Sequence, residues 1–288
     1  MSNPPPLPVT VRLRLAHGCL DHLARDAGMR VLHIKGPALD PVLAQGRAPS
    51  SDCDILVEPG RVEDFCTVLR AHGWDQVTSF EHGSVLGHAA TFHHATWGTV
   101  DVHRTFPGLD RDAGATFSRM WSGRRLIELG GQECAVPALE MQRLVLLAHA
   151  ARDAMGRRAH DVRVAWDMLD DEGRERLDSL ADELGGRVPL ALVTGRPERA
   201  RGERGEALWT TLHEKAPPSA VWWAMLREAA STRERLGVLG AALRLNPDHL
   251  ALRLGHPPSP AELRRERWGR WGRAARHAMH RAARAVRH

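Results

Sequence analysis

Residues 50–57, Ser-Ser-Asp-Cys-Asp-Ile-Leu-Val, are the feature that most constrains this chain. Their pattern predicts a β-strand that begins with two carboxylates and continues into a buried apolar segment. Side chains alternate between the two faces of a strand, so Asp52 and Asp54 are expected on the same side. Neighbouring carboxylates repel each other, and a cation relieves that repulsion. The run therefore predicts a buried strand that begins at a cation site.

A strand that ends in a glycine turn lies upstream. Residues 30–35 have the short apolar pattern of a strand, and Gly36-Pro37 then opens a short helix. A glycine turn lets backbone N–H groups approach a phosphate, and the start of a helix favours anions. Lys35 adds a positive charge at the same place. The segment predicts a phosphate-binding turn.

A third carboxylate lies in a later strand. Residues 99–105 are predicted to form a strand, with Asp101 within it. Mg²⁺ prefers oxygen ligands from carboxylates and phosphates, and two such ions can clamp both the attacking and the leaving oxygen of a phosphoryl transfer. Asp52, Asp54 and Asp101 therefore predict a site for two divalent cations and a nucleoside triphosphate, in which Asp101 accepts a proton from the acceptor.

The order of these features resembles the nucleotidyltransferase superfamily with the DNA polymerase β-like core. A bacterial family described as uncharacterised nucleotidyltransferase is more narrowly similar, over roughly residues 10–170. One departure from the superfamily pattern is Lys35-Gly36-Pro37, where Gly-Gly or Gly-Ser is usual, but the narrower family shares Lys-Gly. The residues that carry the resemblance are Ile34-Lys35-Gly36, Arg47, Ser51-Asp52-Cys53-Asp54-Ile55-Leu56-Val57 and Val100-Asp101-Val102-His103.

The resemblance implies an α/β (α+β) nucleotidyltransferase core with a mixed β-sheet, followed by an all-helical C-terminal domain. It implies Mg²⁺-dependent transfer of a nucleoside monophosphate, expected to be AMP from ATP, with release of pyrophosphate. A small molecule, a modified peptide, a protein side chain and an RNA end all remain open as acceptors. The site residues implied are Asp52, Asp54 and Asp101 as catalytic metal ligands, and Lys35, Gly36, Arg47 and Ser51 as nucleotide contacts.

Hydrophobic periodicity divides the chain into three parts. Residues 1–136 predict an α/β domain, residues 137–256 a helical domain, and residues 257–288 a basic helix after a proline-rich hinge. Helices are predicted at 9–27, 61–72, 138–155, 160–169, 172–184, 206–213, 219–230 and 233–244, and further strands at 74–80, 89–94 and 124–129.

Hydropathy and cysteine spacing along the whole sequence favour a protein of the cytoplasm. The sequence has no N-terminal signal pattern and no apolar run of about 18 residues, so no transmembrane helix is predicted. Nothing in the spacing of the cysteines predicts a metal site or a disulfide framework, which favours a reducing compartment. The four cysteines are Cys19, Cys53, Cys66 and Cys134.

Each motif residue also has an ordinary structural explanation. Asp-x-Asp alone is more often a solvated strand entry than a metal site, although the apolar run after it argues against that here. Asp101 alone would be a polar residue on an exposed strand face, and Lys35 a solvated strand end. Arg47 is balanced between a phosphate contact and a solvated loop position. The combination of motifs favours the metal site.

Two histidines are candidates for supporting roles at this site. If Trp97-Gly98 forms a two-residue hairpin turn, His94 lies opposite Asp101, and a longer turn changes that register. His103 shares the face of Asp101, two residues along the strand. Both are candidates for orienting the carboxylates or for contacting the acceptor.

The C-terminal tail supports a second class of function. After Glu266 the chain has no acidic residue, and Trp268 and Trp271 lie on one side of the predicted helix. Such a helix could bind an anionic partner such as lipid, RNA or acidic peptide, or could dock on the domain surface. The alternative to an enzyme is therefore a degenerate nucleotidyltransferase fold that binds peptide or nucleic acid.

Overall fold

The computed structural model describes residues 7–81, 86–109, 111–152 and 158–243, together with 250, 254, 256, 258–266 and 268–269. The chain divides into two compact units, residues 1–203 and 204–288. The change from α/β to helical sequence predicted at residue 137 lies inside the first unit. The predicted boundary between 1–136 and 137–256 therefore marks a change of secondary structure within one compact unit. Most of the predicted tail helix, residues 257–288, lies outside the described residues.

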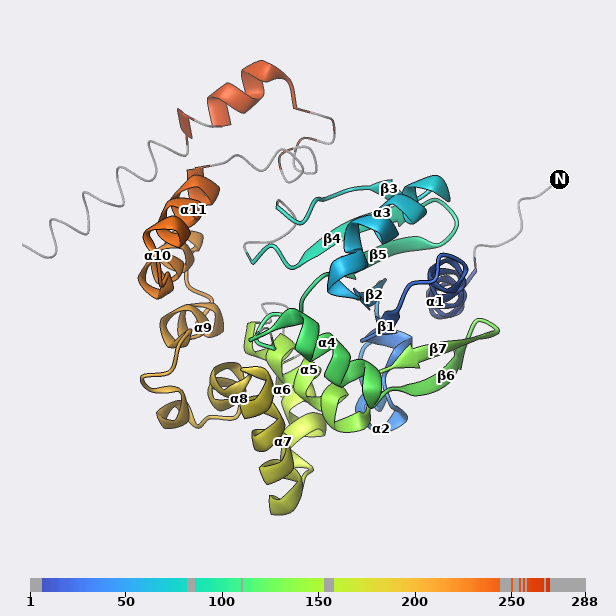
Figure 1. Ribbon diagram of the computed structural model, residues 1–288, viewed down its shortest axis with the longest axis horizontal. Coiled ribbons are helices and arrows are strands. Elements are labelled where there is room, and N and C mark those ends of the chain that lie inside the picture. The colour runs from blue at the N-terminus through green and yellow to red at the C-terminus, as the bar shows by residue number, and fades with distance from the viewer. Residues whose placement is uncertain are drawn as a thin grey trace, which may run out of the picture. The chain divides into compact units, whose positions relative to one another are not determined.

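One mixed sheet of five strands organises the first unit, in the order β1-β2-β5-β4-β3 (Figure 1). β2 is antiparallel to β1 and parallel to β5, whereas β4 is antiparallel to both β5 and β3. β6 and β7 form a separate antiparallel hairpin. The strands are β1 (Val31–His33), β2 (Asp52–Val57), β3 (Asp75–Gln76), β4 (Ala89–His94), β5 (Gly98–His103), β6 (Arg125–Leu129) and β7 (Gln132–Val136).

The two faces of the five-stranded sheet differ in polarity. Helices α1 (Val9–Asp26) and α3 (Val62–Ala71) cover one face, where Ile55 and Val102 lie in the main hydrophobic core. Because side chains alternate along each strand, Asp54, Asp101 and His103 lie on the opposite face. The side chains on the apolar face therefore anchor the sheet in the core, while those on the polar face form the candidate site.

Helix α1 also packs closely against the β6–β7 hairpin. A Cβ atom built on Gly18 of α1 would lie only 2.6 Å from the carbonyl oxygen of Leu129. A Cβ atom on Gly130, in the hairpin turn, would lie equally close, 2.6 Å, to the carbonyl oxygen of Arg14. The two glycines thus allow the backbones of helix and turn to meet directly.

Helix α5 (Leu139–Arg152) is the central helix of the helical part of this unit. Its residues from Met141 to Ala148 are all buried. Even its polar side chains have internal partners: Gln142 Nε2 donates to the Pro137 carbonyl oxygen, and Arg143 Nη1 to that of Val164. The other helical elements of the first unit are α2 (Pro41–Ala44), α4 (Ala113–Ser122), α6 (Arg158–Val162), α7 (Asp171–Leu184), α8 (Arg187–Val193), the 3₁₀ turns η1 (Gly36–Ala38), η2 (Pro59–Arg61) and η4 (Pro197–Ala200), and the π-helical turn η3 (Arg163–Asp167).

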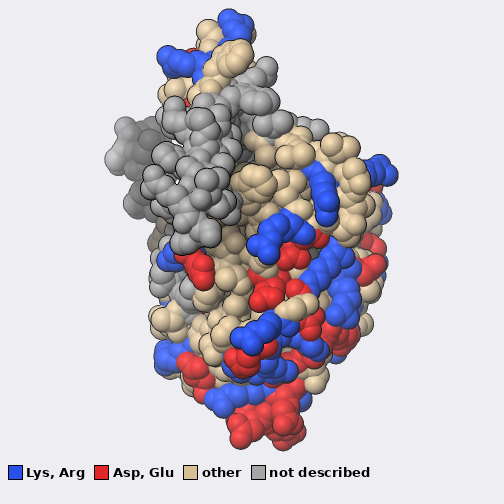
Figure 2. Space-filling view, turned by 90° about the vertical axis from the view of Figure 1, so that its left-hand side faces the viewer, with Lys and Arg blue, Asp and Glu red and all other residues tan. Residues whose placement is uncertain are grey.

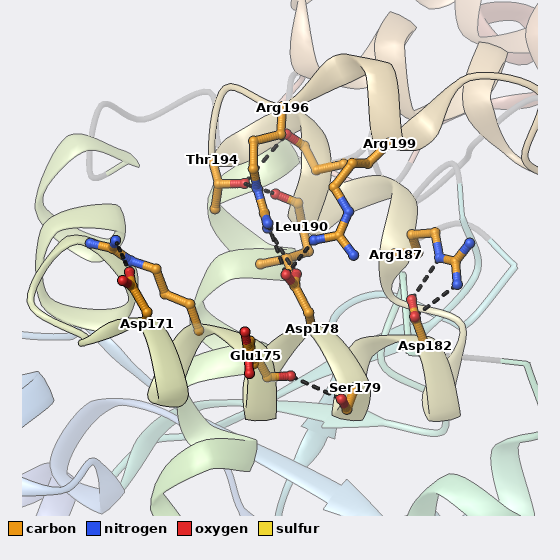
Figure 3. Close-up of polar contacts among 12 residues, drawn as sticks. Asp171, Glu175, Asp178, Ser179, Asp182, Arg187, Leu190, Thr194, Arg196 and Arg199 are labelled. Carbon is orange, nitrogen blue, oxygen red and sulfur yellow. Dashed lines mark hydrogen bonds and ion pairs between the residues drawn. The ribbon is translucent and has the colours of Figure 1, made fainter.

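Arginine–carboxylate pairs join α7 to the segments that follow it (Figure 3). Both Arg187 and Arg196 make two hydrogen bonds to one aspartate, Asp182 and Asp178 respectively. Figure 2 shows cationic and anionic side chains interspersed over the lower part of the face in view. Interspersed charge of this kind favours a solvated surface over the single-sign patch that nucleic acid requires.

The second unit is helical where it is described. Its helices are α9 (Glu206–His213), α10 (Pro218–Glu228) and α11 (Thr232–Leu243). Glu228 accepts hydrogen bonds from the backbone N–H groups of Gly205 and Ala207, which ties the start of α9 to the end of α10. Trp209 is buried, whereas Trp223 is about half exposed. Among the described helices, none combines the length and apolar composition needed to cross a bilayer.

The predicted fold class, a mixed-sheet α/β core followed by helices, is confirmed. Most predicted elements are present, with ends that differ by a few residues. The strand predicted at 74–80 is only Asp75–Gln76, and the helix predicted after Gly36 is a three-residue 3₁₀ turn. The sequence patterns did not predict α4, α8 or β7.

The close contact at Gly18 gives a test of the packing. Gly18→Ala should destabilise the first unit by about 1–3 kcal/mol, because the added methyl group forces α1 away from the hairpin. Alanine is otherwise the better helix residue by about 1 kcal/mol, so a loss shows that packing dominates. Gly114→Ala, at an exposed position near the start of α4, is the matched control and should stabilise the protein by up to about 1 kcal/mol, because no close contact opposes the better helix residue. Urea unfolding of both variants measures the difference; equal stabilities would contradict the contact.

Candidate active site

A buried carboxylate with a lysine and a histidine partner lies at the centre of the polar face. Asp54 Oδ1 is 2.7 Å from Lys35 Nζ and 2.8 Å from His103 Nε2. Asp54 is 4% exposed and His103 is 2% exposed, so water screens this contact poorly. Lys35 follows β1, Asp54 lies on β2 and His103 ends β5, so three segments meet at one oxygen.

Asp101 completes the centre. The parallel register of β2 and β5 pairs it directly with Asp54. Thr91, opposite Asp101 on β4, donates a hydrogen bond of 2.7 Å to Asp101 Oδ1. Donor atoms of Asp54, Asp101 and His103 all lie within 4.8 Å of one another, so these three side chains could share a metal ion. Two carboxylates and an imidazole suit a divalent cation, and the buried Nδ1 of His103 has no hydrogen-bond partner among the described residues.

Asp52 lies on the same face but stands apart from this group. Its Oδ1 accepts a hydrogen bond of 2.9 Å from Ser50 Oγ, and its side chain is partly exposed. Ser51, the serine expected to contact nucleotide, is exposed and lies directly before β2. The structure thus brings Asp54 and Asp101 together and leaves Asp52 at the open entry of β2.

The two central carboxylates have opposite electrostatic environments. Burial raises the pKa of Asp54, but the charge of Lys35 and the hydrogen bond from His103 outweigh it and hold that pKa well below its usual range. Burial and the neighbouring Asp54 carboxylate instead raise the pKa of Asp101. Environments that push two acids apart in pKa are typical of catalytic pairs, and the raised member is the better proton acceptor.

Gly36 allows the chain to turn at the edge of the site. Its φ of +61° lies in the left-handed region that favours glycine, and a Cβ atom there would lie 3.2 Å from Ser50 Cβ. The turn therefore brings the Gly36 backbone against the loop that leads into β2. The 3₁₀ turn that follows is too short to supply the helix dipole expected there from the sequence.

Arg47 is held by a buried ion pair. Its Nε and Nη2 donate to the two oxygens of Asp161 on α6, at 2.8 Å and 3.2 Å. The side chains are 6% and 0% exposed, so this is neither the solvated loop position nor an unpaired phosphate ligand. The pair fastens the loop before β2 to the helical part of the unit.

Three residues near the site carried no sequence motif. His88 packs against His103 with ring centroids 5.4 Å apart, and Arg152 of α5 lies over the Phe106 ring. Burial, with Lys35 and Arg152 as positive neighbours, holds the pKa of His149 on α5 well below its usual range. Helix α5 therefore faces the centre with His149 and Arg152. In the sequence, His149 and Arg152 are the polar residues at the end of the apolar run that begins at Leu144.

The hairpin between β4 and β5 is longer than the two-residue turn considered from sequence. His94 pairs with Gly98, which leaves three residues between the strands, and Thr91 takes the place opposite Asp101. The condition under which His94 would lie opposite Asp101 is therefore not met: the partner of Asp101 is three residues earlier, and this odd shift places His94 on the other face of the strand. There it packs near Trp74 and Trp97. The prediction that His103 shares the face of Asp101 is confirmed.

The fold and this centre define a nucleotidyltransferase. Residues 11–199 match the family described as uncharacterised nucleotidyltransferase, and the chain belongs to that family. Such an enzyme takes a nucleoside triphosphate, an acceptor and a divalent metal ion.

Two other comparisons add little. No curated protein matches the chain. Among solved structures, a lincomycin-bound crystal structure of the lincosamide antibiotic adenylyltransferase LnuA is similar at 14% identity and a TM-score of 0.35, over 51% of this chain and 92% of that chain. A likeness at this level carries no argument about the substrate.

The ion pair of Arg47 with Asp161 gives a test that separates structure from nucleotide binding. Asp161→Asn should destabilise the protein by about 3–5 kcal/mol, because it leaves a buried guanidinium without its counter-charge. Asp171→Asn, in an ion pair whose carboxylate is 96% exposed, is the control and should cost less than about 1 kcal/mol. Urea unfolding measures both.

A double variant completes this test. Arg47→Met with Asp161→Leu should recover most of the lost stability, since apolar residues of similar size often replace a buried ion pair without loss. If the double variant is stable and binds nucleotide as the native protein does, Arg47 is structural. A stable double variant with weakened nucleotide binding would return Arg47 to the phosphate-binding role.

Proposed function

We propose that this protein is a Mg²⁺-dependent nucleotidyltransferase that transfers AMP from ATP to an acceptor and releases pyrophosphate. The observation that carries the proposal is the direct pairing of Asp54 with Asp101 on adjacent parallel strands, with Lys35 against Asp54. Membership of the nucleotidyltransferase family supports the reaction class. The magnesium ion, the choice of ATP and the site residues are our proposal.

The donor atoms at the centre fit magnesium. Asp54 and Asp101 would hold the ions, and Asp52 would join them from the entry of β2, where its carboxylate is accessible. The His103 imidazole is a less usual ligand for this ion, and its hydrogen bond to Asp54 suits an orienting role. Bound magnesium supplies neutralisation of the triphosphate charge and makes the acceptor hydroxyl more acidic.

Lys35 has a second partner in this proposal. Without nucleotide its ammonium group neutralises Asp54. When the triphosphate and its cations bind, Asp54 acquires other positive neighbours, and Lys35 is available to the phosphate oxygens next to the Gly36 turn. Arg152 and His149 of α5 face the same centre and would bound the nucleotide on that side.

Asp101 acts on the acceptor. The acceptor oxygen attacks the α-phosphorus, a new P–O bond forms, and the bond to the bridging oxygen of pyrophosphate breaks. The acceptor proton passes to Asp101, whose raised pKa favours that role. Thr91 orients the carboxylate through its hydrogen bond. A cytoplasmic location, where ATP is abundant, remains our expectation and agrees with the free thiols of all four cysteines.

Nucleotide and metal binding can be tested without knowing the acceptor. Mg²⁺ with ATP at a hundredfold excess over the dissociation constant should raise the melting temperature of the native protein by roughly 5–10 °C. Asp54→Asn should fold and lose this increase, because it removes the central ligand. Asp75→Asn, at an exposed position on β3, is the matched control and should keep it. If Asp54→Asn kept the full increase in melting temperature, the nucleotide and metal site would lie elsewhere.

Chemistry is tested at Asp101. With α-labelled ATP and a panel of candidate acceptors, the native protein should transfer label and release pyrophosphate. Asp101→Asn keeps an oxygen that accepts the Thr91 hydrogen bond but cannot take a proton, so turnover should fall roughly 10²–10⁴-fold while ATP affinity changes little. Transfer at the native rate would exclude Asp101 as the base. Tight Mg·ATP binding with no transfer to any acceptor would favour the degenerate binding protein.

A further inference from the structure

A second polar cluster lies on the opposite, apolar face of the sheet. It consists of Asp21 on α1, His33 on β1 and Cys134 on β7, which are 5%, 0% and 0% exposed. One donor atom from each lies within 4.8 Å of the other two. Polar groups buried in this way are costly unless they are satisfied. The cluster uses none of the residues assigned to nucleotidyl transfer.

His33 points an unsatisfied nitrogen into the cluster. Its Nδ1 lies 2.8 Å from Nδ1 of His17, and this hydrogen bond fixes the orientation of the ring. Its Nε2 is buried, lies 3.5 Å from Asp21 Oδ1, and has no hydrogen-bond partner among the described residues. An imidazole oriented through one nitrogen, with the other directed at a carboxylate and a thiol, is the arrangement of a metal-binding histidine.

Asp21 likewise has one oxygen committed and one directed inward. Arg25 Nε donates to Asp21 Oδ2 at 2.6 Å, which leaves Oδ1 toward His33. The neighbouring Cys134 thiol makes only long contacts, 3.8 Å to the His17 carbonyl oxygen and 4.0 Å to that of Leu129. Each member of the cluster thus has one good donor atom without a strong partner.

The spacing suits a tetrahedral ion. Zinc bonds of about 2.0–2.3 Å place the ligand atoms roughly 3.3–3.8 Å apart. Asp21 Oδ1 and His33 Nε2, at 3.5 Å, already have that separation. The remaining separations, which reach at most 4.8 Å, close with small side-chain rotations. A fourth ligand, water, can enter from a cavity of about 350 Å³ whose lining includes Asp21, Val31 and Ala135.

We propose that Asp21, His33 and Cys134 bind one Zn²⁺ ion at a structural site, with His17 orienting His33. Zinc takes the mixed oxygen, nitrogen and sulfur donors that magnesium does not. On binding, the Cys134 S–H bond breaks, a zinc–sulfur bond forms and the proton leaves to solvent. One carboxylate and one thiolate then balance the double charge of the ion, so the buried complex is neutral.

The zinc site would stabilise the sheet from its apolar face. It joins α1, β1 and β7 at a point where β1 is only three residues long, and two residues beyond His33 the chain reaches Lys35. Without zinc, burial and the Asp21 charge raise the pKa of the Cys134 thiol to about 12, so the metal-free cluster contains a neutral thiol. This agrees with a site whose sulfur ionises only when the ion arrives.

The test begins with the native full-length chain. After expression with added zinc and extensive dialysis, it should retain about one equivalent of zinc by elemental analysis. Replacement by Co²⁺ should produce the near-ultraviolet charge-transfer band of a cobalt–thiolate bond. That band requires a cysteine ligand, and the group of Asp54, Asp101 and His103 has none. Native protein with neither retained zinc nor a thiolate band would overturn the proposal.

Matched variants then locate the ion. Cys134→Ala should lose the band and most of the zinc, whereas Cys66→Ala, at an equally buried cysteine of α3, should keep both. Asp101→Asn should also keep both, which separates this site from the catalytic one. Zinc and band unchanged in Cys134→Ala would overturn the proposal. If Cys134→Ala does not fold, Asp21→Asn serves in its place, with retention of zinc as the contradicting result.

Discussion

The parallel pairing of β2 with β5 is the constraint on which the site depends. It places Asp54 and Asp101 directly opposite each other, and two buried carboxylates at that spacing repel strongly unless positive charge lies between or beside them. The fold supplies that charge through Lys35, just after β1, and the end of β5 adds a hydrogen bond from His103 to Asp54. Apolar partners on the other face hold the register, because a one-residue slip would expose Ile55 and bury Asp54 in the core.

The same repulsion explains why the two acids differ. Lys35 and His103 both contact a single oxygen of Asp54, so Asp54 stays ionised, while Asp101 accepts a hydrogen bond from the Thr91 hydroxyl. One acid is therefore held as a carboxylate, and the other accepts protons more readily. The two acids are prepared for different roles before any substrate binds. The difference in pKa between Asp54 and Asp101 therefore arises from the different side chains that the neighbouring segments place beside each acid.

Local patterns were enough to predict the organising strand, its partner strand and the mixed α/β class, because each depends on short-range periodicity. Contacts between distant segments were not predictable. The pairing of Arg47 with Asp161 spans 114 residues, and no local rule links them. The face of His94 stayed open because it depends on the length and place of the hairpin turn, which the sequence pattern did not decide. Lys35 would follow His33 to the apolar face if β1 continued; it reaches Asp54 because the strand ends at His33.

Cysteine spacing could not reveal the cluster around Cys134 for the same physical reason. Cys134 has no nearby cysteine or metal motif, yet the hairpin brings it to residues of α1 and β1 that lie more than a hundred positions earlier. Gly18 and Gly130 make this possible, since side chains at either position would push the hairpin away from α1. The glycines therefore do more than fill a turn and a helix. By letting two backbones touch, they set the distance between Cys134 and His33, and so determine whether the buried donors can share one ion.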